Sequence, residues 1–208
     1  MIFAIYKPKG ITSAEALRRI KRKIGVEKIG HAGTLDPLAS GILVVATGAD
    51  TKKISEVVAK EKEYVAKIKF GETSETDDEE GKKTVAPVEK IPSLQEVREA
   101  VDGFLGEIEQ RPPIFSAVKI AGKEAYKRAR KGEHIEIPAR KVLIKKIDIL
   151  NYVWPILELR VVTGPGTYIR SLARDIGERL GTGGYLAELE RTAVGEFTRE
   201  KTVFREEL

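Results

Sequence analysis

Residues 30–48 read GHAGTLDPLASGILVVATG and join two different kinds of sequence. The first part holds one carboxylate, Asp36, among glycines and other small residues and directly before Pro37. Gly, Asp, Pro and Ser are the usual residues of surface turns, so a turn alone would account for part of this composition. The second part, residues 42–46, is a continuous apolar run closed by a Thr-Gly pair, which predicts a short buried strand. The stretch therefore predicts an acidic side chain in a tight loop just before a buried strand.

The composition bounds the class of protein and of chemistry. A chain of 208 residues fits one large domain or two small ones and can bury a real core. With 41% hydrophobic and 33% charged residues and no apolar run of bilayer length, we expect a cytoplasmic protein without a membrane partner. There is no cysteine, and the two histidines are His31 and His134, which argues against disulfides and against thiolate or multi-histidine metal sites. We therefore expect chemistry without a metal or a cofactor.

Charge is distributed unevenly around a formal net charge of +5. Residues 119–146 hold ten Lys or Arg against three Glu, and such a basic stretch could meet the phosphates of a nucleic acid. A solvated helix face is the alternative for this stretch. Residues 72–80 hold six acids and no base, and we interpret this run as a solvated loop.

Hydrophobic periodicity predicts a mixed α/β domain of the α+β type, with helices and strands interspersed. The residues that begin two of the helices are typical of capping boxes: Thr12 with Glu15, and Ser93 with Glu96. In the last predicted helix, Arg170 and Arg174 fall outside the apolar stripe. The predicted helices are 12–25, 54–58, 93–104, 124–131 and 169–180, and the predicted strands are 42–46, 62–70, 134–138, 141–150 and 156–162.

Three stretches carry a family resemblance: GHAGTLDPLASG (30–41), QRPPIFSAVKIAGKEAYKRARKG (110–132) and GPGTYIRSLARDIGERLG (164–181). Together they resemble the TruB family of tRNA pseudouridine synthases. Four further segments resemble the family in the right order: KPKGITS (7–13), KEYVAKIKFG (62–71), TSETDDEEG (73–81) and YLAELERTAVGEF (185–197). The resemblance thus covers essentially the whole chain.

The resemblance implies a fold and an activity. The fold is a central mixed, mostly antiparallel sheet flanked by helices, with a basic RNA-clamping insertion at about residues 115–140. One catalytic domain then spans residues 1–208, and the C-terminal PUA domain of many bacterial relatives is absent from this chain, which stops at Leu208. The expected reaction converts a uridine in the tRNA T loop, at position 55, to pseudouridine. The expected partner is the T stem-loop of tRNA, bound by a monomer.

The resemblance also implies roles at the reacting centre. Asp36 is the catalytic carboxylate, and Arg170 keeps it ionised and oriented, because a desolvated carboxylate would otherwise take up a proton. Tyr64 stacks on the target base, and its phenol could move the C5 proton. Leu189, which we interpret as part of a helical apolar stripe, forms a wall of the same pocket.

Further residues are implied to hold the RNA. His31 fills the stacking space left by flipped bases, Lys7 and Pro8 support the floor of the site, and Tyr168 contacts the substrate. The phosphate contacts predicted from the basic stretch are Lys123, Lys127, Arg128, Arg130 and Lys131.

Other interpretations stay open from the residues alone. Tyr64 and Leu189 could be core residues, His31 a structural histidine and Arg170 a surface arginine. Other functions are a glycosidic-bond hydrolase, a non-catalytic RNA chaperone, and a pseudouridine synthase acting on another RNA. A hydrolase usually needs a second carboxylate facing the first, and with the acidic run 72–80 interpreted as solvated, no such partner for Asp36 is evident.

Overall fold

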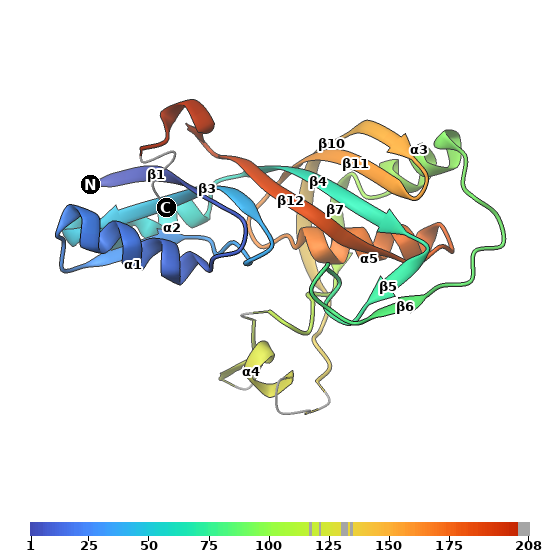
Figure 1. The fold of residues 1–208 in the computed structure, drawn as a ribbon, viewed down its shortest axis with the longest axis horizontal. Coiled ribbons are helices and arrows are strands. Elements are labelled where there is room, and N and C mark those ends of the chain that lie inside the picture. The colour runs from blue at the N-terminus through green and yellow to red at the C-terminus, as the bar shows by residue number, and fades with distance from the viewer. Residues whose placement is uncertain (117, 121, 130–132, 134, 204–208) are drawn as a thin grey trace.

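The computed structural model describes the 208-residue chain except for residues 117, 121, 130–132, 134 and 204–208 (Figure 1). The described part is built around one large sheet. In spatial order its strands are β1 (Ile2–Lys7), β3 (Ser40–Thr47), β12 (Gly184–Val194), β4 (Lys62–Phe70), β11 (Ile156–Thr163), β10 (Arg140–Val153) and β7 (Gly106–Gln110), with β2 (Ile29–Ala32) paired to β3 and β13 (Phe197–Thr198) paired to β12.

Neighbouring strands of this sheet are antiparallel, except that β3 and β12 run parallel over a short contact at Ser40 and Gly41. The predicted mixed, mostly antiparallel sheet is thus confirmed. Two small sheets pair β5 (Glu72–Ser74) with β6 (Lys83–Val85) and β8 (Lys119–Ile120) with β9 (Lys123–Glu124).

Five α-helices and two 3₁₀ turns occur among the described residues. They are α1 (Ser13–Ile24), α2 (Ile54–Val58), α3 (Leu94–Asp102), α4 (Ala125–Ala129), α5 (Ile169–Arg179), η1 (Gly48–Lys53) and η2 (Arg199–Lys201). None of the helices in the described part of the chain is long and apolar enough to cross a membrane.

Local signals set the bounds of the helices. The Thr12 side chain accepts a hydrogen bond from the backbone of Glu15 at the start of α1, and Gly25 ends that helix in the left-handed conformation at φ 65°. The predicted capping box of α3 is complete: Ser93 accepts from the Glu96 backbone, and the Glu96 side chain accepts from the Ser93 backbone.

The core falls into clusters on both sides of the sheet. The largest joins β4, β11 and β10 to α3 and α5, with side chains such as Ile68, Leu159 and Leu172 fully buried. Helix α1 covers one face of β1 and β3, and α2 covers the other. Because β3 is buried on both faces, its sequence is continuously apolar rather than alternating. Figure 1 shows β4 and β12 running together through the middle of the molecule, from the α1 half to the α5 half.

Several predictions for single elements were wrong or incomplete. The strands that were not predicted are β1, β2, β7, β12 and β13 of the large sheet and the short strands β5, β6, β8 and β9. Leu189 lies on strand β12, not on a helix. Residues 135–138, from the predicted strand 134–138, form no strand in the described part; Ile135 and Ile137 instead pack on Ala125 in a small core inside the basic insertion, here residues 115–140.

Candidate active site

Asp36 lies in the loop between β2 and β3, so the prediction that it precedes a buried strand is confirmed. Ser13, at the start of α1, accepts a hydrogen bond from the Leu35 backbone and donates to the Leu35 carbonyl, each at 2.9 Å. The Gly10 backbone donates to the Pro37 carbonyl at 2.8 Å. The backbone on both sides of Asp36 is therefore tied to other elements, while its side chain remains 38% exposed.

Arg170, in the first turn of α5, meets Asp36 directly. Its Nε lies 3.1 Å from Asp36 Oδ2, and the arginine side chain is only 6% exposed. Two backbone carbonyls hold the other end of the guanidinium, Thr76 O at 3.3 Å and Phe115 O at 3.0 Å. Two residues that are 134 positions apart, and that the family resemblance predicted to pair, thus form an ion pair.

Asp78 is a second carboxylate at this site, and sequence reasoning missed it. Its Oδ2 lies 3.4 Å from Arg170 Nη1, and its side chain is 3% exposed. Its Oδ1 accepts hydrogen bonds from the Thr76 hydroxyl and the Glu80 backbone. Charged residues are rarely this buried unless they are paired, and here the pairing cation is Arg170.

The acidic run 72–80 is therefore not the solvated loop that we expected. Asp77, next to Asp78, lies 2.8 Å from Nη1 of Arg174 and is also largely buried. Burial raises the pKa of Asp77 to about 6, although Arg174 and Arg170 oppose the shift. The available signal was the pair Arg170 and Arg174, one turn apart and outside the apolar stripe of their helix, which called for acidic partners.

Burial dominates the electrostatics of Asp36. It raises the pKa of the carboxyl above its usual value, with Asp78 adding to the rise and Arg170, Lys7 and Arg191 opposing it. The cations around Asp36 thus offset the desolvation only in part. Each of these three cations favours the ionised carboxylate.

Lys7 lies beneath the site with no exposed surface. Its Nζ donates to the carbonyls of Pro8 at 2.9 Å and Ile11 at 2.8 Å. Burial lowers the pKa of Lys7 to about 8, against the attraction of Asp36. This burial fits support of the floor and not direct contact with a substrate.

Tyr64 and Leu189 lie on the two central strands, β4 and β12. Tyr64 is 8% exposed and belongs to the main core cluster, and Leu189 packs between that cluster and the core beneath α1. The register sets Tyr64 opposite Arg191 and Ala66 opposite Leu189, so all four residues share one face of the sheet. Sequence reasoning also missed Arg191, a 2% exposed arginine of β12.

Tyr168 precedes α5, two residues before Arg170. The amide of the buried Gln110 clamps its backbone, with distances of 2.8 and 3.1 Å, and the guanidinium of Arg140 lies 5.2 Å from the centre of its ring. Gln110 precedes the basic insertion in the chain, and Arg140 is its last residue. The start of α5 is therefore in contact with residues at both ends of that insertion.

His31 lies on β2 and is half-buried. Burial and the charge of Arg191 lower its pKa, which favours the neutral ring. Its Nδ1 is buried without a hydrogen-bond partner. A hydrogen bond to the Gly33 backbone opposes this shift of the pKa, and a neutral, flat ring is compatible with the predicted stacking role.

The predicted phosphate contacts all belong to the basic insertion. Lys123 and Lys127 belong to β9 and α4 of the basic insertion, and Arg128 Nε pairs with Glu133 at 2.6 Å. Arg130 and Lys131 lie outside the described residues. The α4 segment stands apart from the sheet in Figure 1, as a projection beside the face that carries α5.

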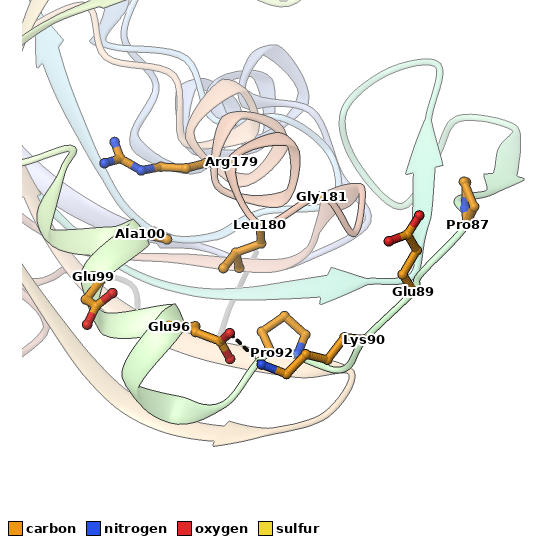
Figure 2. A pocket seen from close by; sticks show the side chains of 10 residues that line it. All are labelled: Pro87, Glu89, Lys90, Pro92, Glu96, Glu99, Ala100, Arg179, Leu180 and Gly181. Atoms are coloured by element: carbon orange, nitrogen blue, oxygen red, sulfur yellow. Dashed lines mark hydrogen bonds and ion pairs between the residues drawn. The ribbon is translucent and has the colours of Figure 1, made fainter.

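A groove of about 740 Å³ lies elsewhere, between α3 and the end of α5 (Figure 2). Its charged lining is mixed, and Lys90 is already paired with Glu96 at 2.8 Å. It contains none of the predicted site residues: the lining is Pro87, Glu89, Lys90, Pro92, Glu96, Glu99, Ala100, Arg179, Leu180 and Gly181. Among the described residues there is also no group of three or more His, Cys, Asp or Glu that could hold a metal ion.

Two protein-family models together match residues 21–208. Residues 21–169 match the N-terminal domain of the TruB family pseudouridylate synthases, and residues 170–208 match the C-terminal domain of tRNA pseudouridylate synthase B. A tRNA pseudouridine synthase B of Corynebacterium diphtheriae is 45% identical over 209 residues, covering 97% of this chain and 70% of the relative. One from Parabacteroides distasonis is 46% identical over 193 residues, covering 91% and 82%.

Solved structures give a similar result. A chain of a Cbf5–Nop10–Gar1 complex matches with a TM-score of 0.74 at 32% identity, covering 95% of this chain. A chain of an H/ACA RNP bound to a substrate RNA containing 2′-deoxyuridine matches with a TM-score of 0.73 at 28% identity, covering 98%. This chain spans 50% of each of those two chains.

Proposed function

The chain belongs to the TruB family of pseudouridylate synthases, which convert uridine in tRNA to pseudouridine, and we propose that its target is the uridine at position 55 in the T loop. The target is proposed from the similarity to tRNA pseudouridine synthase B, and the observation that carries the chemistry is the buried Arg170 between an accessible carboxylate, Asp36, and an inaccessible one, Asp78. Only one of the two acids can meet a nucleotide.

The reaction is an isomerisation. The N1–C1′ bond of the uridine breaks, the base turns, and a C5–C1′ bond forms; the proton on C5 is lost and N1 gains one, so the composition is unchanged. Such a reaction needs an ionised carboxylate acting on the nucleotide and a pocket that retains the detached base. Asp36 supplies the carboxylate, whether it attacks C1′, adds to the base or removes a sugar proton.

Arg170 acts through Asp36. The ion pair at 3.1 Å orients the carboxylate and favours its ionised form against the effect of burial. Asp78 and two backbone carbonyls hold the guanidinium from its other side. The carboxylate thus meets its substrate in a geometry set before binding, which is how positioned groups lower a barrier.

The remaining predicted residues receive the flipped nucleotide. Tyr64 and Leu189 supply an aromatic and an apolar wall, and Tyr168 borders the start of α5. His31 supplies a flat ring for the space that the extruded bases leave. The basic insertion holds the phosphates of the T stem-loop through Lys123, Lys127, Arg128, Arg130 and Lys131.

The burial of Asp78 argues against the hydrolase alternative. A hydrolase needs a second carboxylate that reaches a water or a leaving group. Asp78 is 3% exposed and already paired with Arg170, so it cannot activate a water beside Asp36.

The test is incubation with unmodified tRNA, followed by mapping of each uridine and assay of free uracil. We expect one pseudouridine, at position 55, and no uracil. Free uracil would support the hydrolase, modification at another position or only in another RNA would correct the substrate, and binding without modification would support a chaperone.

A further inference from the structure

Arg191 is a buried cation that the proposed chemistry does not yet use. It lies on β12, and its residue is 2% exposed. Within the described part of the chain it forms no ion pair. Its guanidinium instead donates to two backbone carbonyls, from Nε to Ile42 O at 2.8 Å and from Nη2 to Gly33 O at 3.0 Å.

This burial is costly, so packing alone does not explain an arginine here. Removing a guanidinium from water costs several kcal/mol, and a carboxylate usually offsets that cost. Methionine would fill a similar volume without the penalty. A cation kept under these conditions points to a use for its charge or its hydrogen-bonding fork.

The two carbonyls that Arg191 holds lie at the two ends of the loop that carries Asp36. Gly33 follows β2, and Ile42 lies in β3, so one side chain ties the loop across residues 33–42. At the second end the backbones also touch: Gly41 has φ +113°, and a Cβ there would collide with the backbone of Arg191. Strand β12 therefore contacts the loop at both of its ends.

The charge of Arg191 also reaches the groups around Asp36. The charged groups that face Asp36 are Arg170 of α5, Asp78 of the segment after β5, Lys7 of β1 and Arg191 itself. On other elements, the positive charge of Arg191 lowers the pKa of Lys7, His31 and Lys62. It lowers the pKa of Asp36 as well, in the same direction as Arg170.

We propose that Arg191 is a positioning residue for the isomerisation, which clamps both ends of the 33–42 loop, keeps Asp36 in place and supplies positive charge beneath the loop. It does not touch the substrate, because it is buried beneath the loop. This inference rests on the proposed function, since it assigns Arg191 a part in the same reaction.

The experiment compares R191M, which removes the charge, with R191K, which keeps the charge and loses the fork. Lys62→Met is the matched control: Lys62 is another buried cation bound to backbone carbonyls, and its charge has no resolved effect on Asp36. Single-turnover rates are measured across pH with tRNA tritiated at uridine C5, because the C5 hydrogen leaves to water as the C5–C1′ bond forms. Melting temperature and tRNA affinity are measured on the same samples.

In the profile of rate against pH, we expect the plateau rate of R191M to fall roughly 10- to 100-fold, as for a misplaced catalytic group. The acidic limb of the same profile, where the rate rises as Asp36 ionises, should move to higher pH. R191K should keep the acidic limb of the wild type and lose plateau rate, and Lys62→Met should keep the limb. Affinity for tRNA should stay within about twofold in all three, because no phosphate contact is removed.

An unmoved acidic limb in a folded R191M, or a wild-type plateau in R191K, would overturn the inference. If R191M does not fold, R191K still tests the clamp by its plateau. A wild-type enzyme that releases no tritium would instead overturn the proposed function, so the two failures are distinguishable.

Discussion

Nη1 of Arg170 lies 3.4 Å from Oδ2 of Asp78, and the two side chains are 6% and 3% exposed. The same guanidinium meets Asp36 through Nε, and the side chain of Asp36 is 38% exposed. One cation is thus shared by a buried and an accessible carboxylate. The buried one has no route to the substrate, so its effect on the reaction passes through Arg170.

Asp78→Asn should therefore slow the reaction without weakening RNA binding. Removing the buried charge of Asp78 leaves Arg170 with Asp36 as its one remaining ion-pair partner in the described part of the chain, so the melting temperature should also fall. We expect a single-turnover rate reduced roughly 10- to 100-fold by the displaced arginine. Asp175→Asn is the control, because Asp175 pairs with Arg174 and not with Arg170; a full rate in folded Asp78→Asn would contradict the assignment.

Asp36→Asn should abolish isomerisation and leave tRNA binding largely intact. The amide is nearly isosteric but cannot act as a base or nucleophile, so the rate should fall by about 10³-fold or more. Phosphate contacts supply most of the affinity for RNA, and none is removed. Pseudouridine formation and filter binding are compared with Asp50→Asn, an aspartate paired with the N-terminus; pseudouridine formed at the normal rate by Asp36→Asn would rule out a catalytic carboxylate here.

Lys127→Gln should reduce the salt dependence of tRNA binding. If Lys127 contacts a phosphate, the slope of log affinity against log salt should become shallower by about 0.7 to 0.9. Lys90→Gln is the control, since Lys90 lies outside the basic insertion and is paired with Glu96 of α3. Equal slopes for Lys127→Gln and the wild type would remove Lys127 from the clamp.

Lys62 should make the stability depend on pH in the alkaline range. Burial lowers the pKa of Lys62 from 10.5 to about 8, so the folded protein binds fewer protons than the unfolded chain between these values. The contribution of Lys62 to the free energy of unfolding therefore rises as pH increases from 8 to 10.5. Urea denaturation of the wild type and Lys62→Met at pH 8 and 10 should show the difference between them shift in favour of the wild type; a constant difference would contradict the lowered pKa.

Much of the fold follows from local patterns. Capping residues and apolar spacing predicted α1, α3 and α5, because a helix is set by interactions within a few residues. Strand β12 was missed because its hydrogen-bond register with β4 shifts between Leu186 and Glu188 and again between Arg191 and Ala193. Each shift breaks the alternation of period two that identifies a strand, and the remaining spacing of Leu186, Leu189 and Val194 is typical of a helix.

For the site, local pattern predicted the loop that carries Asp36, and the family resemblance implied that Arg170 is its partner. Only the folded structure shows that Asp78 is buried and that Arg191 binds both ends of the loop. Local pattern treats a run of acids as solvated and a lone arginine as exposed, since each is costly to bury by itself. Their burial depends on partners from distant elements, Arg170 of α5 and the carbonyls of Gly33 and Ile42, which only the order of strands in the sheet brings within reach.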